Sequence, residues 1–148
     1  MKYLSLQEVQ IMHDDIINEI GGLSGANPKQ IALLDSALTQ IQNDDYYPSF
    51  IDKLTHLMFA CVKFHPFADG NKRTALYIAK AFIKLNRPDS LPTDFYQKLE
   101  DVIVSVASDE LSKDELAQIL SAMLKGIQWK AYANPLMKVA KCPINLAG

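Results

Sequence analysis

The sequence predicts a single all-α domain, and three observations support this. Apolar residues recur at helical spacing along most of the 148-residue chain, and an alternating β pattern is almost absent. Capping boxes, glycines and prolines punctuate these segments at the intervals expected of helix starts and ends. With 49% apolar and 22% charged residues, the composition is that of a globular protein and excludes a disordered chain or a coiled coil.

The first two helices are predicted from their caps. Ser5 to Glu8 is a capping box, and it opens a helix that ends at Gly21-Gly22. Asn27-Pro28 supplies an N-cap residue followed by a proline in the first turn, so a second helix should run from there to about Ile41. The polar stretch that follows, residues 43–49, ends the second helix.

Two further helices are predicted in the middle of the chain, and the second of them should be the centre of the bundle. One is predicted from about Phe50 to Phe64, with a buried apolar side, and it runs into His65-Pro66. The next, from Thr74 to Leu85, is apolar on nearly all sides, which is typical of the central element around which the other helices pack.

The last part of the chain predicts two more helices and an extension. Thr93-Asp94 can cap a helix to about Ala107, and the capping box from Ser112 to Glu115 opens a helix to about Ile127. Residues 129–148 contain two prolines and end in glycine, which favours irregular structure. We therefore expect a domain over residues 1–128 and a C-terminal extension over 129–148.

Several classes of protein are excluded by the sequence. No apolar run approaches the roughly 18 to 20 residues needed to cross a bilayer, and the N-terminus lacks a signal-peptide core, so a cytoplasmic protein without membrane association is expected. Cys61 and Cys142 occur in no paired motif, which argues against a disulfide scaffold or a zinc site and predicts two small apolar fillers.

Charge is unevenly distributed along the chain. The net charge is −2, but residues 63–87 contain six cations against the single acid Asp69, a balance that suits an anionic ligand. Lys80, Lys84 and Arg87 are interpreted as a solvated helix face. Direct nucleic-acid binding is not expected, because the whole chain is slightly acidic and contains no recognisable binding module.

The segment from His65 to Ala75 concentrates reactive residue types where one central helix ends and the next begins. Free N–H groups at a helix start and a nearby glycine, Gly70, favour an anion such as phosphate, and Lys72 and Arg73 would neutralise it. Asp69 is a hard oxygen ligand suited to Mg²⁺, and His65 can accept a proton near neutral pH. The competing interpretation is a polar helix–helix corner whose side chains make turns and whose cations are solvated.

This segment resembles the signature of the Fic/Doc family: histidine, any residue, phenylalanine, any residue, an acid, glycine or alanine, asparagine, any residue, arginine. Every position is filled between His65 and Arg73. Ser5, Glu8 and His13 in the first helix, and the glycine-rich stretch after it, are similar to the N-terminal region of death-on-curing (Doc) toxins. The resemblance covers residues 3–125 and implies a Fic/Doc-like helical bundle with a short flap.

The resemblance implies a role for each motif position. His65 would be the general base that deprotonates a target hydroxyl, Phe67 would anchor the loop, and Asp69 would hold Mg²⁺ or orient the nucleophile. The nucleotide phosphates would be surrounded by Gly70, Asn71 (through its amide), Lys72 and Arg73. The resemblance places the flap, which docks an extended stretch of target, at residues 43–50, where an ordinary helix connection is the alternative. His13 is expected to be a packing residue rather than a ligand, although the family has a histidine there too.

Two departures from most Fic enzymes matter for the reaction. Fic enzymes that transfer AMP from ATP have glycine where this chain has Lys72 and a second arginine where it has Leu76. Both differences resemble the Doc branch, which implies a toxin that is a protein kinase, transfers the γ-phosphate of ATP with Mg²⁺, and modifies elongation factor Tu. AMP transfer, and a non-catalytic protein that only binds an antitoxin or regulates an operon, remain the alternatives. The chain lacks the family's self-inhibitory helix motif, so the resemblance implies an antitoxin partner.

Overall fold

The computed structural model describes residues 1–126, which form six α-helices and one short 3₁₀ turn, so the all-α prediction is confirmed for this part of the chain. The elements are α1 (Leu6–Ile20), α2 (Pro28–Gln40), α3 (Phe50–Lys63), α4 (Asn71–Asn86), η1 (Pro88–Ser90), α5 (Phe95–Ala107) and α6 (Lys113–Leu124). The expectations about Cys142, the helix end near Ile127 and the extension over 129–148 lie outside the described residues.

Capping chemistry fixes most of the helix starts. The boxes predicted at Ser5 and Ser112 are both present, each with the serine side chain accepting from the third helical residue. Ser49 and Asp52 form another at the start of α3. The start of α4 differs from the prediction, because this helix begins at Asn71 and not at Thr74. The two motif cations therefore belong to its first turn.

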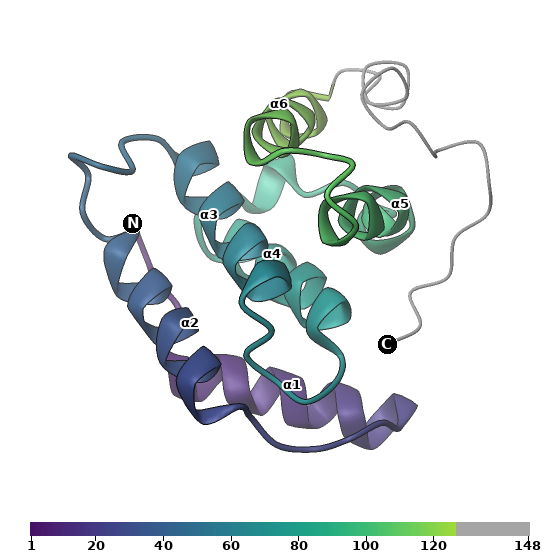
Figure 1. Ribbon diagram of the computed structural model, residues 1–148. Helices are drawn as coiled ribbons and strands as arrows, with labels where there is room; N and C mark the ends of the chain where they lie inside the picture. The colour runs from purple at the N-terminus through teal and green to yellow at the C-terminus, as the bar shows by residue number, and fades with distance from the viewer. Residues whose placement is uncertain (127–148) are drawn as a thin grey trace.

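The helices pack on both sides of a central pair, α3 and α4, which share the most extensive contact in the molecule (Figure 1). Helices α1 and α2 pack on one side of this pair, and α5 and α6 on the other. The prediction made α4 alone the central element. In the structure Lys84 and Leu85 on α4 are exposed, so α4 shares the centre with the more deeply surrounded α3.

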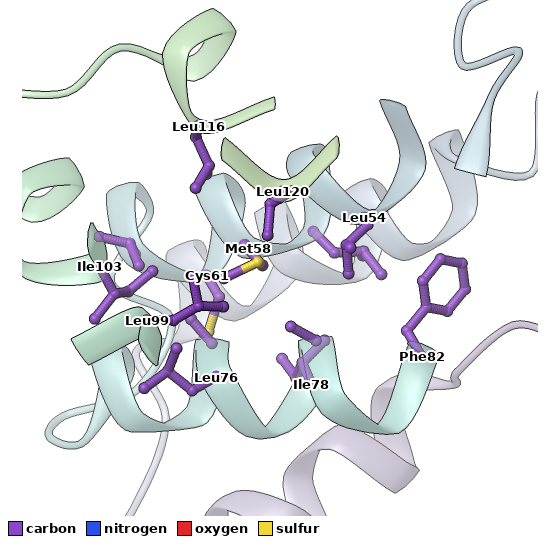
Figure 2. Packing of buried hydrophobic residues seen from close by; sticks show 14 of the residues in the cluster. Leu54, Met58, Cys61, Leu76, Ile78, Phe82, Leu99, Ile103, Leu116 and Leu120 are labelled. Carbon is purple, nitrogen blue, oxygen red and sulfur yellow. The ribbon is translucent and has the colours of Figure 1, made fainter. Parts of the chain in front are cut away.

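Part of the core fills the space between the central pair and the α5–α6 layer (Figure 2). Met58 from α3 and Leu76 from α4 lie close to side chains of α5 and α6, whereas the Cys61 sulfur points toward α4, and all three residues are buried. Burying each large aliphatic side chain contributes about 1.5 to 3 kcal/mol, so this core holds both helices that flank the motif. Cys61 is an apolar filler, as predicted, and burial raises the pKa of its thiol.

The flap prediction is wrong in its placement. Residues 41–49 form turns without a strand, and they precede α3, whereas the motif follows it (Figure 1). A 14-residue helix is roughly 20 Å long, so its whole length separates the two segments. The segment that pairs with the motif is instead the α1–α2 connection, through an isolated antiparallel bridge between Ala26 and Phe67.

None of the helices in residues 1–126 has the length and hydropathy needed to cross a bilayer.

Candidate active site

The motif loop, residues 64–70, connects the two central helices and exposes its histidine. His65 has a left-handed backbone with φ 49°, which is unusual for a residue with a Cβ and costs about 1 to 2 kcal/mol. Its side chain is exposed, whereas the next two residues, Pro66 and Phe67, are buried. The loop thus anchors one side chain in the core, as expected of Phe67, and leaves the imidazole accessible from solvent.

Asn71 closes this loop with its side chain. Its Oδ1 accepts from the Phe67 backbone N–H (3.0 Å), and its Nδ2 donates to the Phe67 carbonyl (2.9 Å). The same Nδ2 lies 3.4 Å from His65 Nδ1, which is longer than a well-formed hydrogen bond, so it orients the ring without fixing which nitrogen is protonated. The family resemblance implies that this side-chain amide faces the nucleotide phosphates. In the structure the buried side chain holds the loop.

Asn27 fastens the loop from outside. This residue occupies the N-cap position of α2, but its side chain makes no capping bond. Its Nδ2 instead donates to the carbonyls of His65 (2.8 Å) and Phe67 (3.3 Å). Backbone bonds from Asn27 N–H to Pro66 and from Ala68 N–H to Gly25 complete the strand-like pairing. These bonds offset the strain at His65.

His13 supports the loop from beneath. It lies on α1, is buried, and its Nε2 is 2.8 Å from the Asp69 carbonyl. Its ring stacks on Phe67 with centroids 3.8 Å apart and an 8° angle between planes. The prediction that His13 is a packing residue is confirmed, and its packing partners belong to the motif.

Asp69 is half-buried, with both carboxylate oxygens engaged by backbone donors. Oδ1 accepts from Gly70 N–H (2.9 Å) and Oδ2 from Leu23 N–H (3.2 Å). Each oxygen retains a lone pair, and a lone carboxylate fits Mg²⁺, which takes few protein ligands and completes its shell with water and phosphate oxygens. Residues 1–126 contain no cluster of three or more His, Cys, Asp or Glu side chains that could hold a metal by themselves.

The first turn of α4 presents free donors and positive charge. Gly70 is its N-cap with φ 75°, a left-handed conformation that glycine adopts readily. The first helical bond runs from Thr74 N–H to the Gly70 carbonyl, so the N–H groups of Asn71, Lys72 and Arg73 have no helical acceptor, and none elsewhere in the described chain. Neither Lys72 nor Arg73 forms an ion pair with a described residue. This turn can bind a phosphate.

The structure confirms the predicted solvated face for two of its three cations, since Lys84 and Arg87 are exposed and Lys80 is half-buried. Lys80 lies over the Tyr96 ring, with its Nζ 4.6 Å from the centroid, and the Arg87 guanidinium lies 5.1 Å from the centre of the Phe50 ring. These two contacts belong to packing on α4 and do not extend the phosphate-binding turn.

The structure therefore brings all six predicted site residues into one loop and the adjoining helical turn. The sequence does not predict which residues outside the motif hold the loop in place, chiefly Asn27 and Gly22. A Cβ added to Gly22 would lie 2.8 Å from Asp69 Oδ2, so only glycine allows this approach. Nothing in the sequence around Asn27 distinguishes a loop clamp from an ordinary helix cap.

Comparison with known proteins agrees with this geometry. The Fic/DOC family model matches residues 3–83. The chain is 29% identical over 122 residues to the protein kinase doc of Escherichia phage P1, covering 81% of this chain and 94% of that protein. It is 31% identical over 105 residues to the toxin Doc of Mycolicibacterium smegmatis, covering 68% of this chain and 80% of that protein. By its motif, its fold and these similarities, the chain belongs to the Fic/Doc family.

Proposed function

We propose that this protein is a Doc-like toxin that transfers the γ-phosphate of ATP to a hydroxyl group of a translation factor, with elongation factor Tu as the first candidate. Similarity to a toxin and to a protein kinase of the same family supports this proposal. An antitoxin protein would be its inhibitory partner, as such toxins require one in the cell that makes them.

The observation that carries the proposal is the pairing of a phosphate-binding turn with an accessible imidazole. Three N–H groups and two cations at the start of α4 have no partner among residues 1–126, and His65 lies exposed in the loop directly before them. Free N–H groups at a helix start and nearby cations attract an anion, and the exposed imidazole beside them adds a group that can act as a base. An anion with a reactive phosphoryl group satisfies them, and a hydroxyl beside the imidazole can attack it.

In the proposed reaction the target hydroxyl oxygen attacks the γ-phosphorus and His65 takes its proton. The new O–P bond forms as the bond from phosphorus to the bridging oxygen of ADP breaks, and ADP leaves with the electron pair. Arg73 and Lys72 stabilise the phosphate charge, together with the N–H groups of the turn that Gly70 caps. Asp69 would hold Mg²⁺, which when bound neutralises phosphate oxygens.

Within this mechanism Asn71 contributes differently from the expectation based on resemblance. Its side-chain amide is occupied by the Phe67 backbone, so the group it offers a phosphate is its own backbone N–H. The side chain holds the loop and orients His65. Positioning of this kind accounts for much of the rate in phosphoryl transfer, since no covalent enzyme intermediate is needed.

Two residues favour phosphoryl transfer over AMP transfer. Lys72 adds a side chain in the first turn of α4, where a glycine would leave space for an α-phosphate. Leu76 is buried in the core among α5 side chains, so this position supplies no second cation for a triphosphate tail (Figure 2).

The test is to incubate the protein with elongation factor Tu and ATP labelled at either the α- or the γ-phosphate. Label from the γ position alone, with a target mass increase of about 80 for one phosphate group, is expected. His65→Ala should reduce transfer by at least about 100-fold and retain the fold, because this side chain is exposed. Label from the α position would establish AMP transfer, and full activity of the variant would remove His65 from the base role.

A further inference from the structure

We propose that His13 is a positioning residue for the transfer reaction, acting through the Asp69 peptide and the Phe67 ring. This inference rests on the proposed function, because it assigns His13 a part in the same site. His13 belongs to α1, 56 positions before Asp69 in sequence, and it touches the motif from below the loop.

The first support is a hydrogen bond whose direction is fixed. His13 Nε2 lies 2.8 Å from the Asp69 carbonyl, and a carbonyl only accepts, so Nε2 must carry the proton. The His13 side chain is 1% exposed, so water cannot replace it as a donor. The other ring nitrogen, Nδ1, lies 3.8 Å from Asp14 Oδ1, beyond hydrogen-bonding distance. Within residues 1–126, the one hydrogen bond of this buried imidazole is therefore made to the motif.

The second support is the peptide unit that this bond holds. The Asp69 carbonyl and the Gly70 N–H belong to one planar peptide group, so fixing the oxygen also fixes the direction of the N–H. That N–H donates to Asp69 Oδ1 (2.9 Å). His13 thereby aims the Asp69 carboxylate and sets the orientation of the N-cap from which the first turn of α4 departs.

The third support is the ring stack. The His13 and Phe67 rings lie nearly parallel, 3.8 Å apart, and the Phe67 backbone is held on its other side by Asn71. His13 thus constrains both ends of the three-residue segment from Phe67 to Asp69. Ile17, one turn further along α1, adds packing, since its Cδ1 would lie 3.5 Å from a Cβ at Gly70.

The test separates the hydrogen bond from the ring. His13→Phe keeps a flat ring against Phe67 but removes the donor, and His13→Gln keeps a donor at a similar reach but removes the ring. We expect kcat for transfer to be about 30-fold lower in His13→Phe than in the wild type, with the KM for ATP nearly unchanged. In His13→Gln, kcat should be at least about tenfold higher than in His13→Phe. Asp14→Asn, on the exposed neighbour, is the control and should leave kcat unchanged.

A second readout does not depend on activity. Amide NMR signals of Gly70, Asn71 and Lys72 should be sharp in the wild type and in His13→Gln, and broadened or shifted in His13→Phe, at temperatures where all three proteins are folded. Unchanged kcat in His13→Phe, or equal losses in both variants that follow their thermal stabilities, would overturn the positioning role. A wild type that transfers no label would instead count against the proposed function, and amide changes still present in His13→Phe would then show only that His13 fixes the geometry of the motif loop.

Discussion

The two connections at the ends of α3 are both rich in polar residues, yet they use them in opposite ways. At the connection over residues 41–49, the buried Lys53 of α3 extends its ammonium to the Ile41 carbonyl and to Asp44 Oδ1 (2.7 Å). In the motif loop, residues 64–70, the backbone is equally well tied, but the helical turn that follows leaves Lys72 and Arg73 without ion pairs in the described chain.

This difference shows that the density of polar residues is a poor guide to a functional site. In the 41–49 connection Asp44 pairs with a cation of the protein itself, and this contact contributes stability. The motif loop satisfies its own peptide groups and presents the next turn to a ligand. Stability and activity should therefore respond separately to substitutions at the two ends of α3, and the following predictions test that separation.

The largest effect is expected from Arg73→Ala. Removing a cation that stabilises transition-state phosphate charge should reduce transfer about 100- to 1,000-fold, while the melting temperature stays within about 2 °C because no ion pair is lost. Lys84→Ala, an exposed cation further along the same helix, is the matched control and should have little effect. Equal activity of the two variants would contradict the assignment of the phosphate site to the first turn of α4.

Lys53→Met should have the opposite profile. Loss of the buried ammonium leaves the Ile41 carbonyl without its donor and should lower the free energy of unfolding by about 2 to 3 kcal/mol, measured by urea denaturation. Transfer per folded molecule should be unchanged. Since the hydrogen bond from Lys53 lowers the pKa of Asp44, the part of this stability due to the pair is present above the ordinary Asp pKa and is lost as pH falls. A large loss of specific activity would contradict the separation.

Gly22→Ala should reduce transfer about tenfold more than Gly21→Ala. Both glycines have positive φ, so both substitutions introduce backbone strain. A Cβ on Gly22 would meet the Asp69 carboxylate and Ile17, whereas one on Gly21 would meet nothing within 4 Å. The difference in kcat between the two variants thus measures how much the reaction depends on the position of the Asp69 carboxylate. Equal kcat values would show that the position of this carboxylate does not limit the reaction.

The smallest effect concerns His56, whose ring packs at a tilt against Tyr47 and accepts a hydrogen bond from Lys113 Nζ (2.9 Å). Burial, with the Lys113 charge, lowers the pKa of His56 from 6.5 to about 4. Between these values the unfolded chain binds a proton that the folded protein does not, so stability should fall as pH drops from 6.5 to 4. We expect a loss of about 1 kcal/mol, given the partial exposure of the ring. His56→Gln should flatten this part of the stability curve, and an unchanged slope would refute the assignment.

Much of the fold could be predicted because its signals are local. Capping boxes at Ser5 and Ser112 and the helical spacing of apolar residues depend only on neighbours along the chain. The prediction starts α4 three residues late, since a glycine N-cap carries no side-chain signal. The flap prediction names the connection between α2 and α3, whereas the connection between α1 and α2 pairs with the motif, and only packing reveals this.

The candidate site divides in the same way. The sequence by itself determined the residue types of the motif from His65 to Arg73 and the helical context that gives them free N–H groups, because both are properties of a short stretch of chain. Tertiary structure decided how those groups are aimed. The Asn27 side chain binds the motif loop and does not cap α2, and the Asn71 amide binds the Phe67 backbone. His13 forms a hydrogen bond with Asp69, 56 positions away. Hydrogen bonds between residues far apart in sequence form only after folding brings them together.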